Sequence, residues 1–120
     1  MANYVDGFVV PVRKKSLAKY KAISRKCMKV WKEHGAVDYV ECVADDVKPG
    51  KWTSFPQSVK LRKGEVVVFS WITYKSRAVR DSCNAKVMKD PRMVPIMNAK
   101  NLPFDGKRLF WGGFWKIVEG

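Results

Sequence analysis

The feature that most constrains this fold is a ten-residue run, 65–74, that is apolar on both sides of a predicted strand. Side chains of a strand point alternately to opposite faces of the sheet. One side of this strand would carry Val66, Val68, Ile72 and Tyr74, and the other would carry Val67, Phe69 and Trp71. The final segment, 107–118, shows the same two apolar sides. The pattern predicts a sheet in which both faces are covered.

The other segments predict how the chain is ordered around that strand. Strands are expected at 4–12, 36–45, 65–74 and 107–118. The first helix begins at Leu17 after a Ser16 cap and stops at Gly35. A second helix starts after Ser76 and buries Val79, Cys83 and Val87. Two short helices are expected, one that runs from a Thr53 or Ser54 cap to about Leu61 and one at 91–98, capped by Asp90. This β-α-β-β-α-β order predicts one α+β domain over residues 1–120, a ferredoxin-like fold with a four-stranded antiparallel sheet.

Two helices cover only one face of such a sheet, which leaves the second apolar face to be explained. Exposure of that face would forfeit about 25 cal/mol for each Å² left unburied. A second copy packed sheet to sheet covers it by two-fold symmetry, so a homodimer is predicted. Gly112 and Gly113 suit a bulge or a close backbone approach at the seam. The alternative is a monomer whose long connection, 51–64, folds over the second face.

Several short segments in matching order carry a family resemblance. They are YVDGFVV at 4–10, VEC at 40–42, VFSWI at 68–72, DPRM at 90–93, PFDGKR at 103–108 and GGF at 112–114. Through them the chain resembles the YbaA-like family of small bacterial proteins, a domain of unknown function. The resemblance implies a dimeric α/β barrel, a superfamily that includes cofactor-free monooxygenases and many members without an assigned activity. It supplies no catalytic residues to carry over.

Three polar residues interrupt otherwise apolar strands: Asp6, Glu41 and Ser70. A buried carboxylate must be paired or protonated, so such groups are structural hydrogen-bonding centres or acid/base candidates. If the three share the interior, Asp6 or Glu41 is a candidate general base for a small carbon acid or phenol. Trp71 or Trp111 would form an apolar wall of the ligand site. The alternatives are structural pairing and exposure at a strand edge.

A formal net charge of +13 suggests a different kind of partner. The stretch 13–32 contains basic residues and no acidic ones. Candidate polyanion-binding residues on the first helix are Lys19, Arg25, Lys26 and Lys29. The other interpretation is a solvated helix face. An RNA-recognition motif is excluded, because Lys63 and Gly64 are followed by Glu65 and valines where that motif needs aromatic residues.

The remaining reactive residues predict no metal site or cofactor. Cys27, Cys42 and Cys83 are widely spaced and are expected to be small core residues. His34 suits the C-terminal end of the first helix, and Arg77 and Asp81 suit a surface ion pair. The common nucleotide, esterase and metalloprotease signatures are missing from the sequence. No signal peptide or membrane span is predicted, so a cytoplasmic location is expected.

These observations leave three functional hypotheses. The first is a homodimer that binds a small apolar or weakly acidic molecule beside the sheet, with cofactor-free acid/base or oxygenase-like chemistry. The second is non-specific binding of nucleic acid or another polyanion through the first helix. The third is a structural protein without a ligand.

Overall fold

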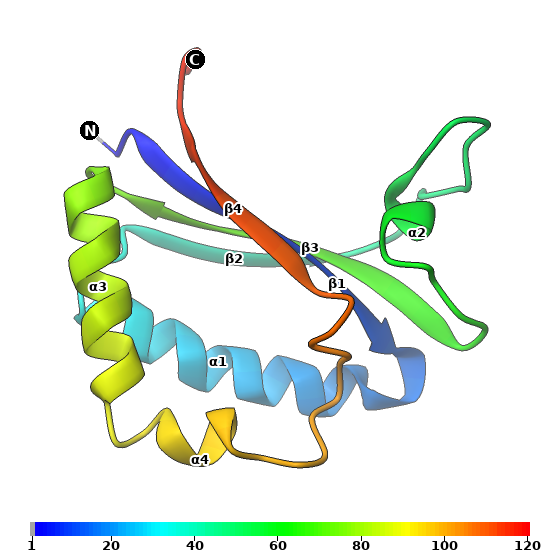
Figure 1. The fold of residues 1–120 in the computed structure, drawn as a ribbon, viewed down its shortest axis with the longest axis horizontal. Coiled ribbons are helices and arrows are strands. Elements are labelled where there is room, and N and C mark those ends of the chain that lie inside the picture. The colour runs from blue at the N-terminus through cyan, green and yellow to red at the C-terminus, as the bar shows by residue number, and fades with distance from the viewer. Residues whose placement is uncertain (1) are drawn as a thin grey trace.

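The computed structural model describes residues 2–120, which form one antiparallel four-stranded sheet with strand order β2-β3-β1-β4. Helices α1, α3 and α4 lie on one side of the sheet (Figure 1). In chain order the elements are β1 (Tyr4–Arg13), α1 (Leu17–Glu33), β2 (Asp38–Val43), α2 (Phe55–Ser58), β3 (Glu65–Tyr74), α3 (Arg77–Lys89), α4 (Val94–Met97) and β4 (Phe110–Trp115). The molecule measures 37 × 37 × 20 Å, the thickness of one sheet and one helical layer. The predicted ferredoxin-like α+β fold is confirmed.

Side-chain caps begin α2 and α3, but not α1 or α4. Ser54 accepts a hydrogen bond from the Gln57 backbone NH, and Ser76 accepts one from the Val79 backbone NH, as N-caps should. Gly35 ends α1 with a φ of +126°, a conformation that favours glycine. The prediction for Ser16 was wrong in part. A 3-10 turn at Lys14–Ser16 leads directly into α1, and the Ser16 side chain makes no capping bond.

Four predicted elements are shorter in the structure. α2 ends at Ser58 instead of near Leu61. Asp90 accepts a hydrogen bond from the Arg92 backbone NH, but residues 91–93 form a turn, so α4 begins only at Val94. In β4, Leu109 precedes the paired residues, and the strand ends at Trp115. β2 similarly pairs over Asp38–Val43.

The main core lies between the sheet and the helices. Tyr4, Ile72 and Tyr74 from the sheet pack in one cluster with Val30 of α1 and Val87 of α3. All five side chains are buried. Burial of this stripe from each helix fixes α1 and α3 on the same sheet face.

The opposite sheet face is covered at one end only. Val59, from the segment after α2, packs on Val9 and Val67 in a second buried cluster. Farther along the same face the aromatic side chains are open, with Phe69 42% exposed and Phe114 60% exposed. The long connection therefore covers part of the second face and leaves its aromatic part uncovered.

Gly113 is required by a close approach from the helix-covered side. A Cβ at this position would collide with Tyr4 Oη and lie 2.6 Å from Nη2 of Arg80. A close approach is therefore found within the protomer at Gly113, where the Arg80 guanidinium crosses from α3 to β4, while a Cβ at Gly112 would make only ordinary contact with Phe114.

Candidate functional site

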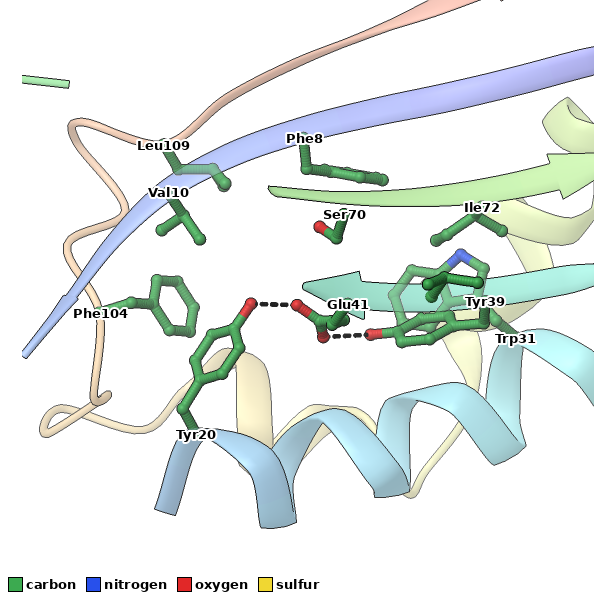
Figure 2. Close-up of a pocket in the computed structure, with 11 residues that line it drawn as sticks. Phe8, Val10, Tyr20, Trp31, Tyr39, Glu41, Ser70, Ile72, Phe104 and Leu109 are labelled. Carbon is green, nitrogen blue, oxygen red and sulfur yellow. Dashed lines mark hydrogen bonds between the residues drawn. The ribbon is translucent and has the colours of Figure 1, made fainter. Parts of the chain in front are cut away.

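A partly open pocket of about 120 Å³ lies between α1 and the sheet (Figure 2). Its walls are mostly aromatic and aliphatic. The lining residues are Phe8, Val10, Tyr20, Trp31, Tyr39, Val40, Glu41, Ser70, Ile72, Phe104 and Leu109. An apolar hollow of this order accommodates a single aromatic ring. The pocket is thus a small-molecule site by shape, with few polar groups to orient an occupant.

Two tyrosines hold the carboxylate of Glu41 in this pocket. Tyr20 Oη donates to Glu41 Oε1, and Tyr39 Oη donates to Oε2 over 3.2 Å. Tyr39 and Glu41 stand two residues apart on β2, so their side chains share a face. Tyr20 reaches the same carboxylate from α1 (Figure 2). One helix and one edge strand therefore build the site together.

Burial and the nearby Glu41 raise the pKa of both phenols above the ordinary tyrosine value. The two tyrosines thus keep their protons at neutral pH and remain hydrogen-bond donors. Burial, followed by the charge of Glu41, also raises the pKa of the Cys27 thiol to about 11. Within residues 2–120 no ion pair involves Glu41. The carboxylate is therefore hydrogen-bonded without being neutralised by a cation.

This arrangement leaves lone pairs of Glu41 open to the pocket. A carboxylate has about four lone-pair sites, and the two phenols occupy two of them. Ser70, opposite Glu41 in the β2–β3 register, lines the same pocket. The geometry suits a positioned base whose carboxylate is oriented by two OH donors.

Asp6 shares the sheet face of Glu41 and Ser70 but does not line their pocket. Its carboxylate is 1% exposed, and Oδ1 lies 3.6 Å from Nε of Arg80. Burial raises its pKa, while the Arg80 charge opposes that rise. Arg80 also donates to Tyr4 Oη over 2.8 Å. The structure thus brings Glu41 and Ser70 together and places Asp6 in a separate pair with Arg80.

The two predicted tryptophan walls lie on different faces of the sheet. Trp111 is on the helix-covered face, where its ring stacks on Phe8 with 5.8 Å between centroids. It therefore lies behind a pocket wall without lining the pocket itself. Trp71 follows Ser70 directly and faces the opposite side, beside Phe69. Trp71 therefore cannot form a wall of the Glu41 pocket.

Sequence reasoning missed the two tyrosines that define the site. Tyr39 precedes Glu41 by two residues, so their spacing alone places both side chains on one face of the strand. Tyr20 falls on the apolar spacing of the first helix, and a buried phenol needs a hydrogen-bond partner. Its partner is set by the packing of α1 along β2, which no local pattern shows.

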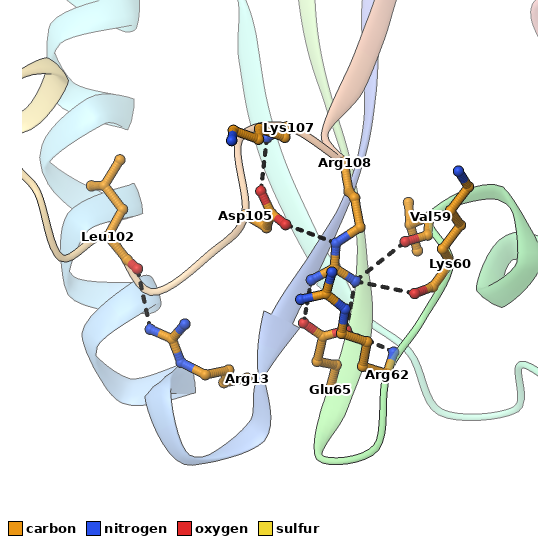
Figure 3. Close-up of polar contacts among 9 residues, drawn as sticks. All are labelled: Arg13, Val59, Lys60, Arg62, Glu65, Leu102, Asp105, Lys107 and Arg108. Atoms are coloured by element: carbon orange, nitrogen blue, oxygen red, sulfur yellow. Dashed lines mark hydrogen bonds and ion pairs between the residues drawn. The ribbon is translucent and has the colours of Figure 1, made fainter.

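A second polar cluster, which we call the Arg108 clamp, contains Arg108, Glu65 and Asp105 (Figure 3). Arg108 contacts both oxygens of Glu65, at 2.8 and 2.6 Å, and Nε binds Asp105 at 2.8 Å. It also donates to the backbone carbonyls of Val59 and Lys60. These bonds lower the pKa of both carboxyls. The clamp joins the start of β3 to the segments around residues 60 and 105.

The other candidate residues occupy mainly surface positions. Arg25, Lys26 and Lys29 are exposed on α1, and Lys19 Nζ donates to the Asn101 carbonyl over 2.8 Å. The predicted surface pair of Arg77 and Asp81 is confirmed, with 3.8 Å between Nε and Oδ2.

His34 caps α1 and lies 2.8 Å from Oδ2 of Asp90. That contact, after the stronger one from Arg92, lowers the pKa of Asp90. All three cysteines are free thiols; Cys83 is buried and Cys27 half-buried. The core prediction for Cys42 was wrong, because its side chain lies on the uncovered sheet face beside Phe69 and is exposed.

Within residues 2–120 no group of three or more His, Cys, Asp and Glu residues is assembled for a metal ion. Over the same residues, no helix is both long enough and apolar enough to cross a membrane.

The sheet order, helix placement and pocket define the chain as a ferredoxin-like α+β protein with a small site between α1 and the sheet. The fold is similar to that of a dimeric ferredoxin-like protein from an uncultured marine organism, with a TM-score of 0.61, 10% identity and coverage of 98% of this chain and 99% of that one. A protein from Bacillus cereus, provisionally assigned as an antibiotic biosynthesis monooxygenase, is similar at a TM-score of 0.53 and 9% identity, with coverage of 100% and 98%. At these identities the similarity shows the fold alone.

Sequence comparison gives the family. The family model described as "Protein of unknown function (DUF1428)" matches residues 3–106. The uncharacterized protein YbaA of Escherichia coli K12 is 47% identical over 117 residues, covering 98% of each chain. This chain belongs to the DUF1428 family, which confirms the predicted YbaA-like relationship.

Proposed function

We propose that the pocket beside Glu41 binds a small apolar or weakly acidic molecule and that Glu41 removes a proton from it. The observation that carries this proposal is the Glu41 carboxylate, held by two phenols and without a cation, in an otherwise apolar pocket. The tyrosines orient the carboxylate and leave about two of its four lone-pair sites free to take the proton of a substrate.

The walls of the pocket favour a molecule with one ring and few charges. Phe8, Ile72 and Leu109 offer apolar contact, and Ser70 offers a single hydroxyl. A C–H next to a carbonyl, or a phenolic O–H, would give its proton to Glu41. Once Glu41 has taken the proton, Tyr20 or Tyr39 can turn its single O–H from Glu41 to the resulting enolate or phenolate oxygen.

Oxygenase-like chemistry is an extension of this proton transfer. A carbanion formed from a methylene group can react with O₂, so that the CH₂ becomes C=O and the second oxygen atom leaves as water. The provisional assignment of the Bacillus cereus neighbour as a monooxygenase supports this extension. Oxygen uptake in an oxygen electrode, with the same compound as below, tests it separately.

The test uses phenylacetone, which has one ring and an acidic C–H next to its carbonyl. Amide NMR shifts on titration should cluster at residues 39–41 and 70, and the protein should accelerate deuterium exchange at the benzylic carbon in D₂O. Glu41→Gln should retain the shifts and lose about 100-fold or more of the exchange rate, the usual contribution of a general base. Glu119→Gln, at an exposed carboxylate, is the matched control. Equal exchange rates in Glu41→Gln and Glu119→Gln would overturn the role of Glu41.

We also infer that the protein is a homodimer through the uncovered sheet face. Phe69, Phe110 and Phe114 are each more than two-fifths exposed there, next to Trp71. Contiguous aromatic exposure of this kind is typical of an interface. The dimeric state of the marine ferredoxin-like neighbour supports the same assembly.

The dimer is tested by light scattering at micromolar protein concentration. The wild-type mass should be twice 13.8 kDa, and Phe69→Asp with Phe114→Asp should give the monomer mass. Val94→Asp, at an exposed apolar residue of α4 on the helix side, should stay dimeric. A monomeric wild-type protein would refute the assembly.

The exposed charges of α1 favour a second candidate function, binding of nucleic acid or another polyanion. Arg25, Lys26 and Lys29 are exposed, and among residues 2–120 none of the three is in an ion pair. Retention on heparin at low salt should fall on charge reversal at these residues and Lys19. Unchanged retention would exclude this candidate.

A further inference from the structure

A second hollow, of about 670 Å³, lies along the outer side of the Glu41 site, between α1 and the edge strand β2. We call it the α1–β2 groove. Its floor is apolar and its rim carries two cations. The lining residues are Leu17, Ala18, Tyr20, Lys21, Ser24, Arg25, Met28, Tyr39, Glu41, Cys42, Val43 and Val68.

The groove and the Glu41 pocket are continuous through shared walls. Tyr20, Tyr39 and Glu41 line both hollows. The hydrogen-bonded carboxylate therefore stands at the junction between a small inner pocket and a larger outer groove. A molecule too long for the pocket could place one end at Glu41 and the rest in the groove.

The charges of the groove are not balanced. Lys21 and Arg25 stand one turn apart on α1, and both are exposed. Like charges at this spacing oppose helix formation. Among residues 2–120 neither is in an ion pair, and Glu41, the acid of the groove, is bound to the two tyrosines. The rim therefore offers two free cations beside an apolar floor.

We propose that the α1–β2 groove binds small amphipathic anions, organic acids whose carboxylate or sulfonate lies between Lys21 and Arg25 while their apolar body covers Leu17, Met28 and Val43. A guanidinium one helical turn from an ammonium gives an anionic group two charge-assisted partners. This rests on the proposed function, because it adds an anionic group to the molecule that reaches Glu41. It names the substrate class as an aromatic or aliphatic acid.

Two fluorescent probes with a common body test the proposal. 1-Anilinonaphthalene-8-sulfonate carries the anionic group, and N-phenyl-1-naphthylamine has the same rings without it. The sulfonate should bind the double variant Lys21→Gln with Arg25→Gln at least tenfold more weakly than it binds the wild type. The neutral probe should bind both proteins equally.

The control is Lys26→Gln with Lys29→Gln, which removes the same charge from exposed α1 residues that do not line the groove. It should bind the sulfonate as the wild type does. An equal loss of sulfonate binding in both double variants would show that net charge alone causes the effect, and it would overturn the proposal.

Amide NMR distinguishes the groove from the uncovered sheet face, which could also attract these probes. The sulfonate should shift residues 17–28 and 39–43; shifts confined to 69, 71 and 110–114 would overturn the groove site. If neither the neutral probe nor phenylacetone binds at the pocket, the proposed function is refuted. Binding of the sulfonate that depends on Lys21 and Arg25 would still stand in that case.

Discussion

Glu41 and Glu65 are both strand glutamates with two hydrogen-bonded oxygens, yet their partners differ in kind. The oxygens of Glu65 face one guanidinium, that of Arg108, whose other NH groups bind Asp105 and two backbone carbonyls. The oxygens of Glu41 face two neutral phenols from two different elements. The first carboxylate is paired with a cation, and the second, within residues 2–120, is not.

The difference separates a structural cluster from a candidate reactive one. A bidentate pair with a guanidinium fixes geometry and occupies lone pairs on both oxygens. Two phenols also fix geometry, but they add no positive charge. The Arg108 clamp therefore holds segments together, whereas Glu41 is oriented without a cation and keeps lone pairs open to the pocket. Variants should separate these roles, since loss of the clamp should affect stability and loss of the phenols should affect the site.

The largest expected effect is on the clamp. Arg108→Ala leaves Glu65 without its cation, at a side chain that is 10% exposed, and it also removes the bonds to Asp105, Val59 and Lys60. Breaking a largely buried pair by removing one partner destabilises a protein by about 3 kcal/mol. Urea unfolding at neutral pH measures the change. Lys107→Ala, at an exposed neighbour, should stay within about 0.5 kcal/mol of the wild type. A loss below 1 kcal/mol for Arg108→Ala would show that the clamp is a surface pair of little consequence.

The phenols should have smaller effects. Tyr20→Phe removes the hydrogen bond to Oε1 of Glu41 and leaves that oxygen without this donor, at about 1–2 kcal/mol of stability. Tyr39→Phe removes a bond of 3.2 Å and should cost about 0.5–1 kcal/mol. The same urea measurement ranks them, and both variants should bind phenylacetone with altered affinity. If both leave binding and exchange unchanged, the phenols have no role in the site.

Part of the site could be predicted from the sequence, because alternation along a strand separates its two faces. Glu41 and Ser70 were predicted as candidates, with the question of a shared face left open, and the β2–β3 register sets them opposite each other. The same alternation excludes Trp71, which follows Ser70 directly. The apolar second face was also predictable from 65–74. Its partial cover by Val59 was not, because that depends on how the long connection packs.

The rest depended on long-range geometry. Asp6 lies on the same sheet face as Glu41 and Ser70, but it pairs with Arg80 of α3. The sequence does not show which end of a helix lies over which end of a strand. Arg108 joins residues 43 positions apart in sequence, a contact that no local pattern encodes. Tyr20 reaches Glu41 because α1 packs along β2, and that packing follows from the whole sheet order.

Acid pH should lower the contribution of the Arg108 clamp to the unfolding free energy and raise that of Asp6. Arg108 holds the pKa of Glu65 and Asp105 below their ordinary values, so their stabilising contribution is present above about pH 4 and is lost as the pH falls through the folded-state values. The stability difference between wild type and Arg108→Ala should therefore shrink as urea unfolding is repeated from pH 7 down to about pH 3.

Burial raises the pKa of Asp6, so its contribution is largest below about pH 4 and declines as the pH rises. Asp6→Asn should remove that decline and move the optimum of the unfolding free energy toward higher pH. If the difference in unfolding free energy between wild type and Arg108→Ala stays constant across this pH range, Arg108 acts through packing. The contrast between a carboxylate that is paired with a cation and one that is not would then lose its electrostatic basis.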